Sequence, residues 1–418
     1  MHWKAVAQLM LVGATSAAHI ASAPYSKQMA ASIMSRRQGI MTGSGGSSEL
    51  LQAGFVQKAF TALVAQYPSS NDSFAAEVQK YIRDSAASVA PFVSNATKDA
   101  LGYPMDRLSN GNALLALSDS SLPSSGSGSN ATVDYAAAAE ALRLSIDLNR
   151  RNNESGLWYF VYPYWSYLDG MYSLAPFYTL YTLDDAAAAS SPVNTTALDD
   201  VLLQLELLWQ HTHNETSGLL VHGYDASRTA VWADPGTGAS PHVWGRSLGW
   251  FAMALVDTLE MLSGAEGACH LTGYATRLGA MFRSLAAALV GAVDGASGAW
   301  WQVMDEPGRE GNYIESSGSP MFAYALLKGA RLGYLDGAGA AAAAAASQVG
   351  VRARTYLTDT FVVDNGNGTL GYNGTVSVCS LNSTASYEYY VGQPISYNSV
   401  LGSAAYILAS LEAERVGL

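Results

Sequence analysis

Hydrophobic residues recur at helical spacing along most of the chain from about Ser48 onward. One such apolar face, in the stretch 246–262, consists of Leu248, Phe251 or Ala252, Leu255, Leu259 and Leu262. The pattern predicts helices over 49–66, 73–89, 110–118, 133–149, 170–184, 197–210, 246–262, 271–291, 319–334, 338–359 and 394–414. Few stretches alternate polar and apolar residues as a strand would, so the pattern predicts an all-α fold.

Clusters of Gly, Pro, Asn and Ser break the helical pattern every ~15 to 40 residues, and no sequence repeat accompanies them. This favours helices paired into a closed toroid over a solenoid of near-identical units. No break is followed by a change in composition, so the chain is expected to form a single domain.

Residues 1–23 combine a Lys, an apolar stretch and then small residues, which is the pattern of a secretory signal peptide. Nine N-x-S/T sequons agree with secretion and predict surface loops at Asn71, Asn95, Asn130, Asn153, Asn194, Asn214, Asn367, Asn373 and Asn382. Cys269 and Cys379 could be joined in an oxidising compartment, but two cysteines are too few for a disulfide-built fold.

Charged residues are sparse, at 13%, and the net charge is −12 without basic runs, which argues against nucleic acid and anionic membranes as partners. No stretch after the first 23 residues reaches the ~20 consecutive apolar residues of a membrane span. An anionic substrate would therefore need to be bound by local groups.

The stretch His222–Trp250 contains polar and aromatic residues between two apolar segments, and its glycines and prolines predict a long loop before the helix from 246. Arg246 and Trp250 are four positions apart, so both are expected to project from the first turn of that helix. A guanidinium and an indole suit a sugar acid, because the indole covers the apolar face of a pyranose and the guanidinium pairs with a carboxylate. The alternative is an ordinary stacked surface pair.

Asp169 follows a segment rich in Tyr and Trp, YPYWSYLDGMY from Tyr162, just ahead of a predicted helix. A carboxyl group among aromatic rings is partly desolvated, which favours its protonated form and suits a proton donor. The alternative is a helix N-cap, since Asp often occupies that position.

Asp106, in YPMDRL, has the same two interpretations, a cap or a second acid of the site. Its neighbour Arg107 is expected to keep it ionised, which suits a base or a water-orienting role. Ser316, Ser317 and Ser319 precede another predicted helix, where amides and hydroxyls could bind a carboxylate or simply cap the helix.

Four separate motifs, HGYD, WADPGTGASPHVWGRSLGW, YLDGMY and SSGSPMFAYALLKG, together resemble the unsaturated rhamnogalacturonyl hydrolases of glycoside hydrolase family 105. The resemblance spans most of 101–333 and implies an (α/α)6 barrel, a toroid of six helical hairpins, formed by residues 24–418 as one catalytic domain. It also implies a reaction. An acid protonates the C4=C5 enol ether of an unsaturated galacturonyl residue, water adds at C5, and the hemiketal opens and releases the rest of the oligosaccharide.

The resemblance places Asp169 at the catalytic acid and His222, Arg246 and Trp250 among the active-site residues, and Asp106 at a second acid. The chain departs from the family at Tyr167, where Trp is expected, and in GLWYFVYP from Gly156, where a His–Lys pair is expected. We expect Tyr167 to contact substrate all the same. These departures affect the subsites that bind the rest of the oligosaccharide.

The leading interpretation is therefore a secreted, extracellular hydrolase that acts as a monomer on unsaturated rhamnogalacturonan oligosaccharides. An unsaturated glucuronyl hydrolase is the nearest alternative, because fold alone does not separate these activities. A non-catalytic sugar-binding toroid is the other. No spacing of His, Cys or Asp matches a metal site, and no organic cofactor is indicated.

Overall fold

The computed structural model describes residues 23–44, 48–68, 73–118, 133–265 and 268–417. The predicted signal peptide lies almost wholly outside them. The α-helices are α2 (Tyr25–Ser35), α3 (Glu49–Gln66), α4 (Ser73–Val93), α5 (Gly111–Ser118), α6 (Tyr135–Asp147), α7 (Asp169–Ala188), α8 (Thr195–Thr212), α9 (Gly245–Gly264), α10 (Thr272–Gly291), α11 (Gly318–Arg331), α12 (Ala340–Phe361), α13 (Tyr387–Val391) and α14 (Val400–Arg415). Short 3-10 helices are η1 (Ala100–Gly102), η2 (Met105–Asn110), η3 (Ala268–Leu271) and η4 (Asp336–Ala338).

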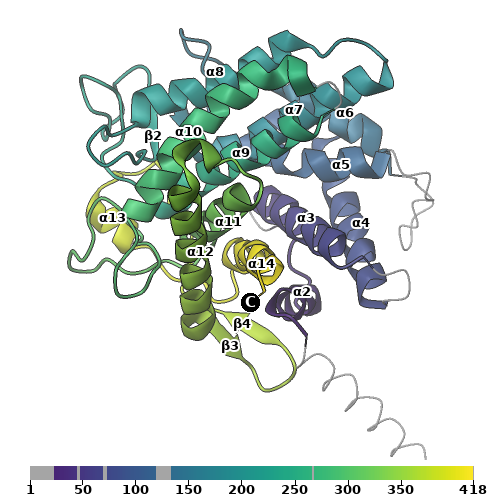
Figure 1. Ribbon diagram of the computed structural model, residues 1–418. Helices are drawn as coiled ribbons and strands as arrows, with labels where there is room; N and C mark the ends of the chain where they lie inside the picture. Colours follow the sequence, from purple (N-terminus) through teal and green to yellow (C-terminus); the bar gives the residue numbers. More distant parts are fainter. Residues whose placement is uncertain (1–22, 45–47, 69–72, 119–132, 266–267, 418) are drawn as a thin grey trace, which may run out of the picture.

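The helices form two concentric rings. Around the inner ring, α3 packs on η2, η2 on α7, α7 on α9, α9 on α11, α11 on α14, and α14 on α3 again. Helix α5 directly continues η2, and the two form one inner element. The inner elements also pack on outer helices, in the pairs α3 with α4, α5 with α6, α7 with α8, α9 with α10, α11 with α12, and α14 with α2 (Figure 1). These six pairs confirm the predicted all-α toroid of helical hairpins.

The pattern of buried residues distinguishes the inner helices from the outer ones. In α14, every residue from Val400 to Ala413 is buried, because the helix lies between its inner neighbours and α2. A helix that is covered on all sides needs no polar face. In the outer helix α10, by contrast, the buried residues fall on one stripe, with Leu278, Phe282, Leu285 and Leu289 among them.

The last helix closes the ring against the first. Ser26 Oγ of α2 donates a hydrogen bond to Glu414 Oε2 of α14 at 2.7 Å, and Tyr67 Oη donates to the same oxygen at 2.8 Å. Figure 1 shows α2 and α14 side by side. Helix α2 is absent from the sequence-based prediction, which begins at residue 49.

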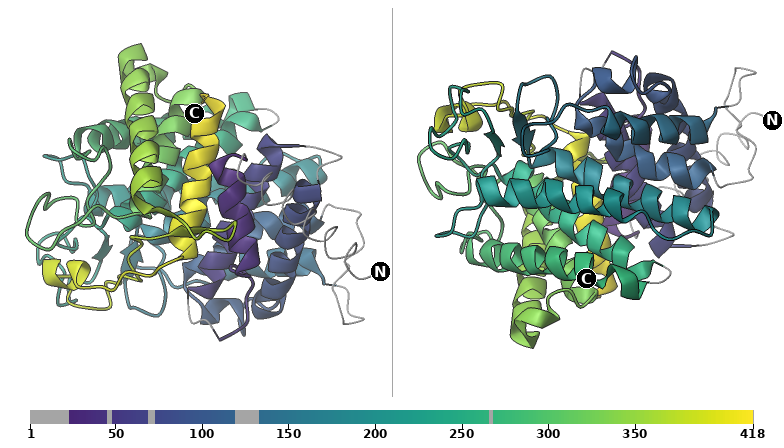
Figure 2. Two further views of the ribbon diagram at one scale, coloured as in Figure 1. Left: turned by 90° about the horizontal axis from the view of Figure 1, so that it is seen from below. Right: turned by 90° about the horizontal axis from the view of Figure 1, so that it is seen from above.

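Two short antiparallel ribbons interrupt the helices. Strand β1 (Trp165–Tyr167) pairs with β2 (Gly223–Asp225), and β3 (Val362–Asp364) pairs with β4 (Leu370–Tyr372). Both views of Figure 2 show the loops around β2 on the same side of the molecule as α13. This loop-rich end carries the candidate site.

Several sequence-based expectations concern the surface. The seven sequon asparagines within the described residues are all exposed, as predicted, at Asn95, Asn153, Asn194, Asn214, Asn367, Asn373 and Asn382. Cys269 and Cys379 are both free, the first exposed and the second buried, so they do not form the disulfide that was considered. Among the helices of the described ranges, none has the length and apolarity needed to cross a bilayer.

Candidate active site

The ribbon of β1 and β2 brings Asp169 and His222 together. Tyr167 pairs with Gly223, and one residue further on the amide of Leu168 donates to the carbonyl of His222 at 3.1 Å. Because the strands run antiparallel, the residue that leaves β1 into α7 lies beside the residue that enters β2. Two motifs more than fifty positions apart in the sequence therefore meet at the start of α7.

Asp169 is the first residue of α7, but its side chain does not cap the helix, so the N-cap interpretation is wrong. Instead, Ser247 Oγ from the first turn of α9 donates a hydrogen bond to Asp169 Oδ2. His222 Nε2 lies 3.2 Å from the same oxygen, within ion-pair distance but out of line for a hydrogen bond. The side chain keeps 11% of its surface exposed, so the carboxyl group remains accessible.

His222 is completely buried and is held from the far end of the chain. Its Nδ1 lies 2.8 Å from the hydroxyl of Tyr390 in α13, and the ring contacts those of Trp244 and Tyr167. Burial raises the pKa of Tyr390 well above its ordinary value, so this hydroxyl keeps its proton and is able to donate it to Nδ1. A neutral His222 that accepts this bond carries its proton on Nε2, which faces Asp169.

Asp106 lies in η2 and is also buried next to the site. It does not cap a helix, since its Oδ1 accepts a hydrogen bond from Tyr159 Oη at 2.9 Å. Burial, opposed in part by that hydrogen bond, raises the pKa of Asp106 to about 7, and the charge of Asp169 adds to the rise. The carboxyl group therefore holds a proton in a range where an exposed aspartate is ionised.

The expectation that Arg107 keeps Asp106 ionised is wrong. The guanidinium of Arg107 points toward α6, where it donates to Ser145 Oγ at 3.0 Å and to Asn149 Oδ1 at 3.1 Å, and back to the carbonyl of Tyr103. The charge of Arg107 lowers the pKa of Asp106, but this effect is smaller than those of burial, of the Tyr159 hydrogen bond and of Asp169. Adjacent positions in the sequence thus hold side chains with separate surroundings.

Arg246 is only 1% exposed and already has partners. Its guanidinium donates to the carbonyls of Val376 and Ser377 and to Ser317 Oγ, and it lies over the ring of Trp244, with 4.7 Å between Cζ and the centroid. These bonds fasten the segment that follows β4 to the start of α9. A substrate carboxylate would have to replace some of them, so the predicted role of Arg246 stays a prediction.

Trp250 is likewise 1% exposed, and it packs in the interior against Tyr172 and Phe55, with ring centroids 4.4 and 4.7 Å apart. The helical spacing correctly places it one turn beyond Arg246, but it does not form an accessible pair with it. Its indole packs α9 against α7 and α3 in the interior. A sugar ring has no access to this indole in the described arrangement.

The start of α11 holds a carboxylate, but one from the protein itself. The amides of Ser317 and Gly318 donate to Glu315 Oε2 at 2.9 and 2.7 Å, and the amide of Val376 donates to Oε1 at 3.0 Å. The anion-binding site predicted around Ser316, Ser317 and Ser319 is therefore filled by Glu315.

Tyr167 is 3% exposed and forms part of a stack of aromatic rings. Its ring lies parallel to that of Tyr159, at 4.3 Å between centroids, and parallel to that of Tyr162, at 6.2 Å. Tyr159 is the residue that donates to Asp106, so this stack begins at the acids. Tyr167 contacts the site through the edge of His222, at 5.3 Å.

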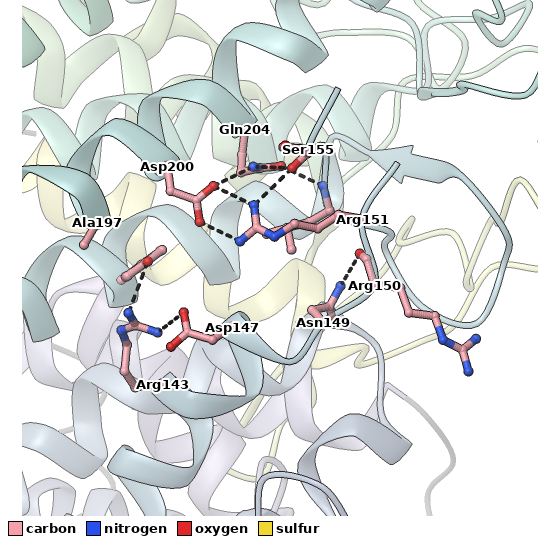
Figure 3. Close-up of polar contacts among 12 residues, drawn as sticks. Arg143, Asp147, Asn149, Arg150, Arg151, Ser155, Ala197, Asp200 and Gln204 are labelled. Atoms are coloured by element: carbon pink, nitrogen blue, oxygen red, sulfur yellow. Dashed lines mark hydrogen bonds and ion pairs between the residues drawn. The ribbon is translucent and has the colours of Figure 1, made fainter. Parts of the chain in front are cut away.

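The segment that bears these rings, between α6 and β1, is fastened to α8 (Figure 3). Arg151 forms a bidentate pair with Asp200, with both N···O distances 2.7 Å. Gln204 donates to Asp200 and to the carbonyl of Ser155, and its Oε1 accepts from the amide of Leu157 at 2.7 Å. A planar fork of this kind holds the chain in one orientation.

The sequence did not indicate Ser247, Tyr390 or Tyr159 as site residues. Ser247 directly follows Arg246 in the WGRS motif and could have been suggested as a helix-start hydroxyl. Tyr390 could not, because it is 168 positions from His222 and nothing in a single sequence relates the two.

A two-ring helical toroid whose loop-rich end holds two neighbouring carboxyl groups and a buried histidine suits an enzyme that acts on a carbohydrate, and comparison with known sequences defines the class. The sequence model of Glycosyl Hydrolase Family 88 matches residues 125–417. The chain belongs to this family.

Among solved structures, a family 105 glycoside hydrolase from C. acetobutylicum is similar over 94% of this chain and 100% of its own, with 29% identity and a TM-score of 0.77. The unsaturated glucuronyl hydrolase from Bacillus sp. GL1 shares the fold, with 14% identity, a TM-score of 0.60 and coverage of 94% and 95%. A curated relative, protein Atu3128 from Agrobacterium fabrum, is 38% identical over 207 residues, 48% of this chain and 83% of the relative. These similarities support an unsaturated uronyl hydrolase.

Proposed function

We propose that the protein removes the unsaturated galacturonyl residue from the non-reducing end of rhamnogalacturonan oligosaccharides. The observation that carries this proposal is the pairing of an accessible carboxyl group, Asp169, with a buried neighbour, Asp106, whose pKa is raised to about 7. Protonation of a carbon atom requires an acid that still holds its proton at working pH. The choice of substrate comes from the resemblance of the four motifs to the unsaturated rhamnogalacturonyl hydrolases, and a solved family 105 structure is similar over nearly the whole chain.

In the proposed reaction, Asp169 transfers its proton to C4 of the enol ether, and the electron pair of the C4=C5 bond forms the new C–H bond. Water then adds to C5 and returns a proton to the Asp169 carboxylate. The resulting hemiketal at C5 opens to a ketone as its bond to the ring oxygen breaks, and that oxygen takes up the proton of the C5 hydroxyl. C1 is then a hemiacetal, which collapses to an aldehyde as the C1–O bond breaks and the remaining oligosaccharide leaves with a proton on its oxygen. This differs from a pair of carboxyl groups acting directly on the glycosidic bond.

Asp106 has a supporting part in this proposal. The charge of Asp169 is one cause of the raised pKa of Asp106, so the two carboxyl groups are close enough to interact. The raised pKa lets Asp106 keep a proton up to near-neutral pH beside Asp169, the carboxyl group that faces substrate in this proposal. Ser247 donates a hydrogen bond to Asp169 Oδ2, and the buried His222 Nε2 lies 3.2 Å from the same oxygen, so the two residues limit how the carboxyl group can turn.

An unsaturated glucuronyl hydrolase is the second candidate, because the Bacillus sp. GL1 enzyme with that activity has the same fold. Both candidates predict the same chemistry at C4 and C5 but different aglycones. Two lyase-generated disaccharides, one from rhamnogalacturonan and one with an unsaturated glucuronyl residue, separate them. Hydrolysis removes the double bond, so loss of its ultraviolet absorbance reports each reaction.

Asp169→Asn tests the mechanism. The variant keeps the size of the side chain but has no proton to transfer, so its kcat should fall by roughly a thousandfold or more. Asp185→Asn, an exposed position on the same helix, is the matched control and should retain full activity. Near-normal turnover by a folded Asp169→Asn protein would remove this residue from the mechanism.

The proposal includes secretion as a glycoprotein and action as a monomer. The exposure of the seven described sequons supports the first part, since an oligosaccharyl transferase must reach each asparagine. Sequencing the N terminus of the protein recovered from culture medium tests for removal of the predicted signal peptide. A protein retained in the cell with residues 1–23 intact would contradict it.

A further inference from the structure

Five aromatic rings form a continuous series that leads away from the two acids, and we call it the aromatic ladder. Its members are Tyr159, Tyr167, Tyr162, Trp165 and Trp232. The successive centroid distances are 4.3, 6.2, 5.3 and 5.1 Å. The first three rings are parallel within 8°, the fourth is inclined by 28°, and the last meets the fourth edge-on.

The ladder has an inner and an outer part. Its inner end touches the site, since Tyr159 donates to Asp106 and Tyr167 meets the edge of His222. Tyr167 and Trp232 are buried, whereas Tyr159, Tyr162 and Trp165 are only partly buried. Beyond Tyr159, which is bonded to Asp106, the accessible aromatic surface of the ladder therefore consists of Tyr162 and Trp165.

We propose that Tyr162 and Trp165 bind the sugars that follow the unsaturated uronyl residue, with Tyr162 nearer to the bond that is released. This proposal rests on the proposed function and extends it to chain length. The C–H faces of a pyranose pack on the exposed parts of aromatic rings, and Tyr162 and Trp165 each keep part of their surface accessible. The ladder is continuous with the site, so a substrate held at Asp169 can extend along it.

The ladder segment carries no charge. None of the eleven residues 158–168 has a charged side chain. The nearest cations along the chain already have partners, since Arg151 pairs with Asp200 and Arg150 lies over the ring of Trp158 at 5.5 Å. Trp158 in turn packs against Tyr164, off the ladder. Contact with this segment is therefore made through the C–H faces of the sugars and not through ion pairs.

The ladder is also held in place before any sugar arrives. The bidentate pair of Arg151 with Asp200 and the bonds of Gln204 fix the segment on α8 (Figure 3). In addition, the amide of Tyr159 donates to the carbonyl of Trp165 at 2.8 Å, which joins the two ends of the ladder segment. A rigid platform binds without the entropic cost of ordering a loop.

The test compares chain lengths. Wild type, Tyr162→Ala and Trp165→Ala are assayed on the unsaturated disaccharide and tetrasaccharide from rhamnogalacturonan. The wild type should have a higher kcat/KM on the tetrasaccharide. Trp165→Ala should lower kcat/KM for the tetrasaccharide about tenfold, through KM, and should lower that for the disaccharide much less, because loss of one stacking contact is worth about a factor of ten. Tyr162→Ala should lower kcat/KM for both substrates, because Tyr162 is proposed to contact the first sugar after the uronyl residue.

Two controls separate binding from a structural part. Tyr164→Ala removes an exposed ring of the same segment that lies off the ladder, and it should leave the ratio between the two substrates unchanged. Trp165→Phe keeps a ring and should restore most of the tetrasaccharide preference. An equal fall in kcat on both substrates with Trp165→Ala would mean that the ring only shapes the acids, and it would overturn the proposal.

Failure of the proposed function gives a different result. If wild type hydrolyses neither substrate, the function is wrong, and calorimetric titration with the tetrasaccharide then decides the ladder separately. Binding that Trp165→Ala weakens and Tyr164→Ala does not would support the platform without catalysis. No binding, or binding that is the same in both variants, would reject it.

Discussion

Asp106 and Asp257 are both buried carboxyl groups on the inner ring, and they differ in what surrounds them. Asp257, in α9, lies 2.6 Å from Lys328 Nζ and 2.8 Å from Lys58 Nζ, and it accepts a hydrogen bond from Tyr324 at 2.7 Å. Asp106 has a single tyrosine donor, and its neighbouring arginine is turned toward α6. One group lies in a cluster of cations and the other lies among rings and a second acid.

Burial acts on both groups in the same direction, so the partners decide the result. At Asp257, burial would raise the pKa, but Lys328 and Lys58 outweigh it and lower the pKa to about 2. At Asp106 the hydrogen bond from Tyr159 does not offset burial, and the pKa rises to about 7. The same residue type thus serves as a fixed anion within the barrel and as a proton-holding acid at its end.

The largest expected effect comes from removing the anion. Asp257→Asn removes the carboxylate shared by Lys328 and Lys58 and leaves Lys328 with only Glu260 as an anionic partner, which should reduce the free energy of unfolding by about 3 kcal/mol. Thermal unfolding at neutral pH measures this as a lower Tm, with the exposed Asp359→Asn as control. Equal Tm values for Asp257→Asn and wild type would show that the lysines find other partners.

Low pH should destabilise the wild type for the same reason, because it protonates Asp257. The folded pKa of Asp257 lies below its ordinary 3.8, so its contribution to stability is complete above that value and is lost as the pH falls toward about 2. The Tm of Asp257→Asn should therefore vary less than that of wild type over this range.

Asp106→Asn should have the opposite effect on stability. The folded pKa of Asp106 is raised, so its contribution is complete below about 3.8 and is lost as the pH rises through about 7. Above that pH the wild type must hold a buried carboxylate without a cation, and the amide removes a cost on the order of 4 kcal/mol. The variant should have a higher Tm than wild type at pH 8 and a similar one at pH 4, while its turnover falls less than that of Asp169→Asn. A lower Tm at pH 8 would contradict this account.

Tyr159→Phe should give the smallest change. The hydrogen bond from this hydroxyl lowers the pKa of Asp106, so its removal should raise that pKa further. Because the proposed acid pair is active while it holds a proton, activity falls as the pH rises through this pKa. The alkaline limb of the profile of kcat/KM against pH should move upward by up to about one unit. A limb that moves downward would mean that another group sets it.

Most of the fold could be predicted from the sequence, because the spacing of apolar residues within a segment is enough to indicate a helix. Helix α3 occupies the predicted range 49–66, and α9 extends the predicted 246–262 by one or two residues at each end. Helix α14 begins six residues later than predicted, since 394–399 belong to the irregular segment after β4. Helix α2 was missed, because its apolar residues directly follow the predicted signal peptide.

The site could be predicted only in part, for a physical reason. Periodicity shows which residues share a face of a helix, but it does not show what covers that face. Arg246 and Trp250 were placed correctly along α9, yet Val376 and Ser377 cover the first and Tyr172 and Phe55 cover the second. Such partners come from distant segments.

The seam between α2 and α14 bears on biosynthesis. Helices α2 and α3 are synthesised long before α14, so the hydrogen bond between Ser26 and Glu414, 388 positions apart, forms only late in synthesis. Until then, the apolar faces that α14 will cover have no partner, and the inner ring cannot close. A message cut short before the codon for Val400 would remove an inner wall of the ring, and the nascent protein would keep its apolar interior open to chaperones and proteases.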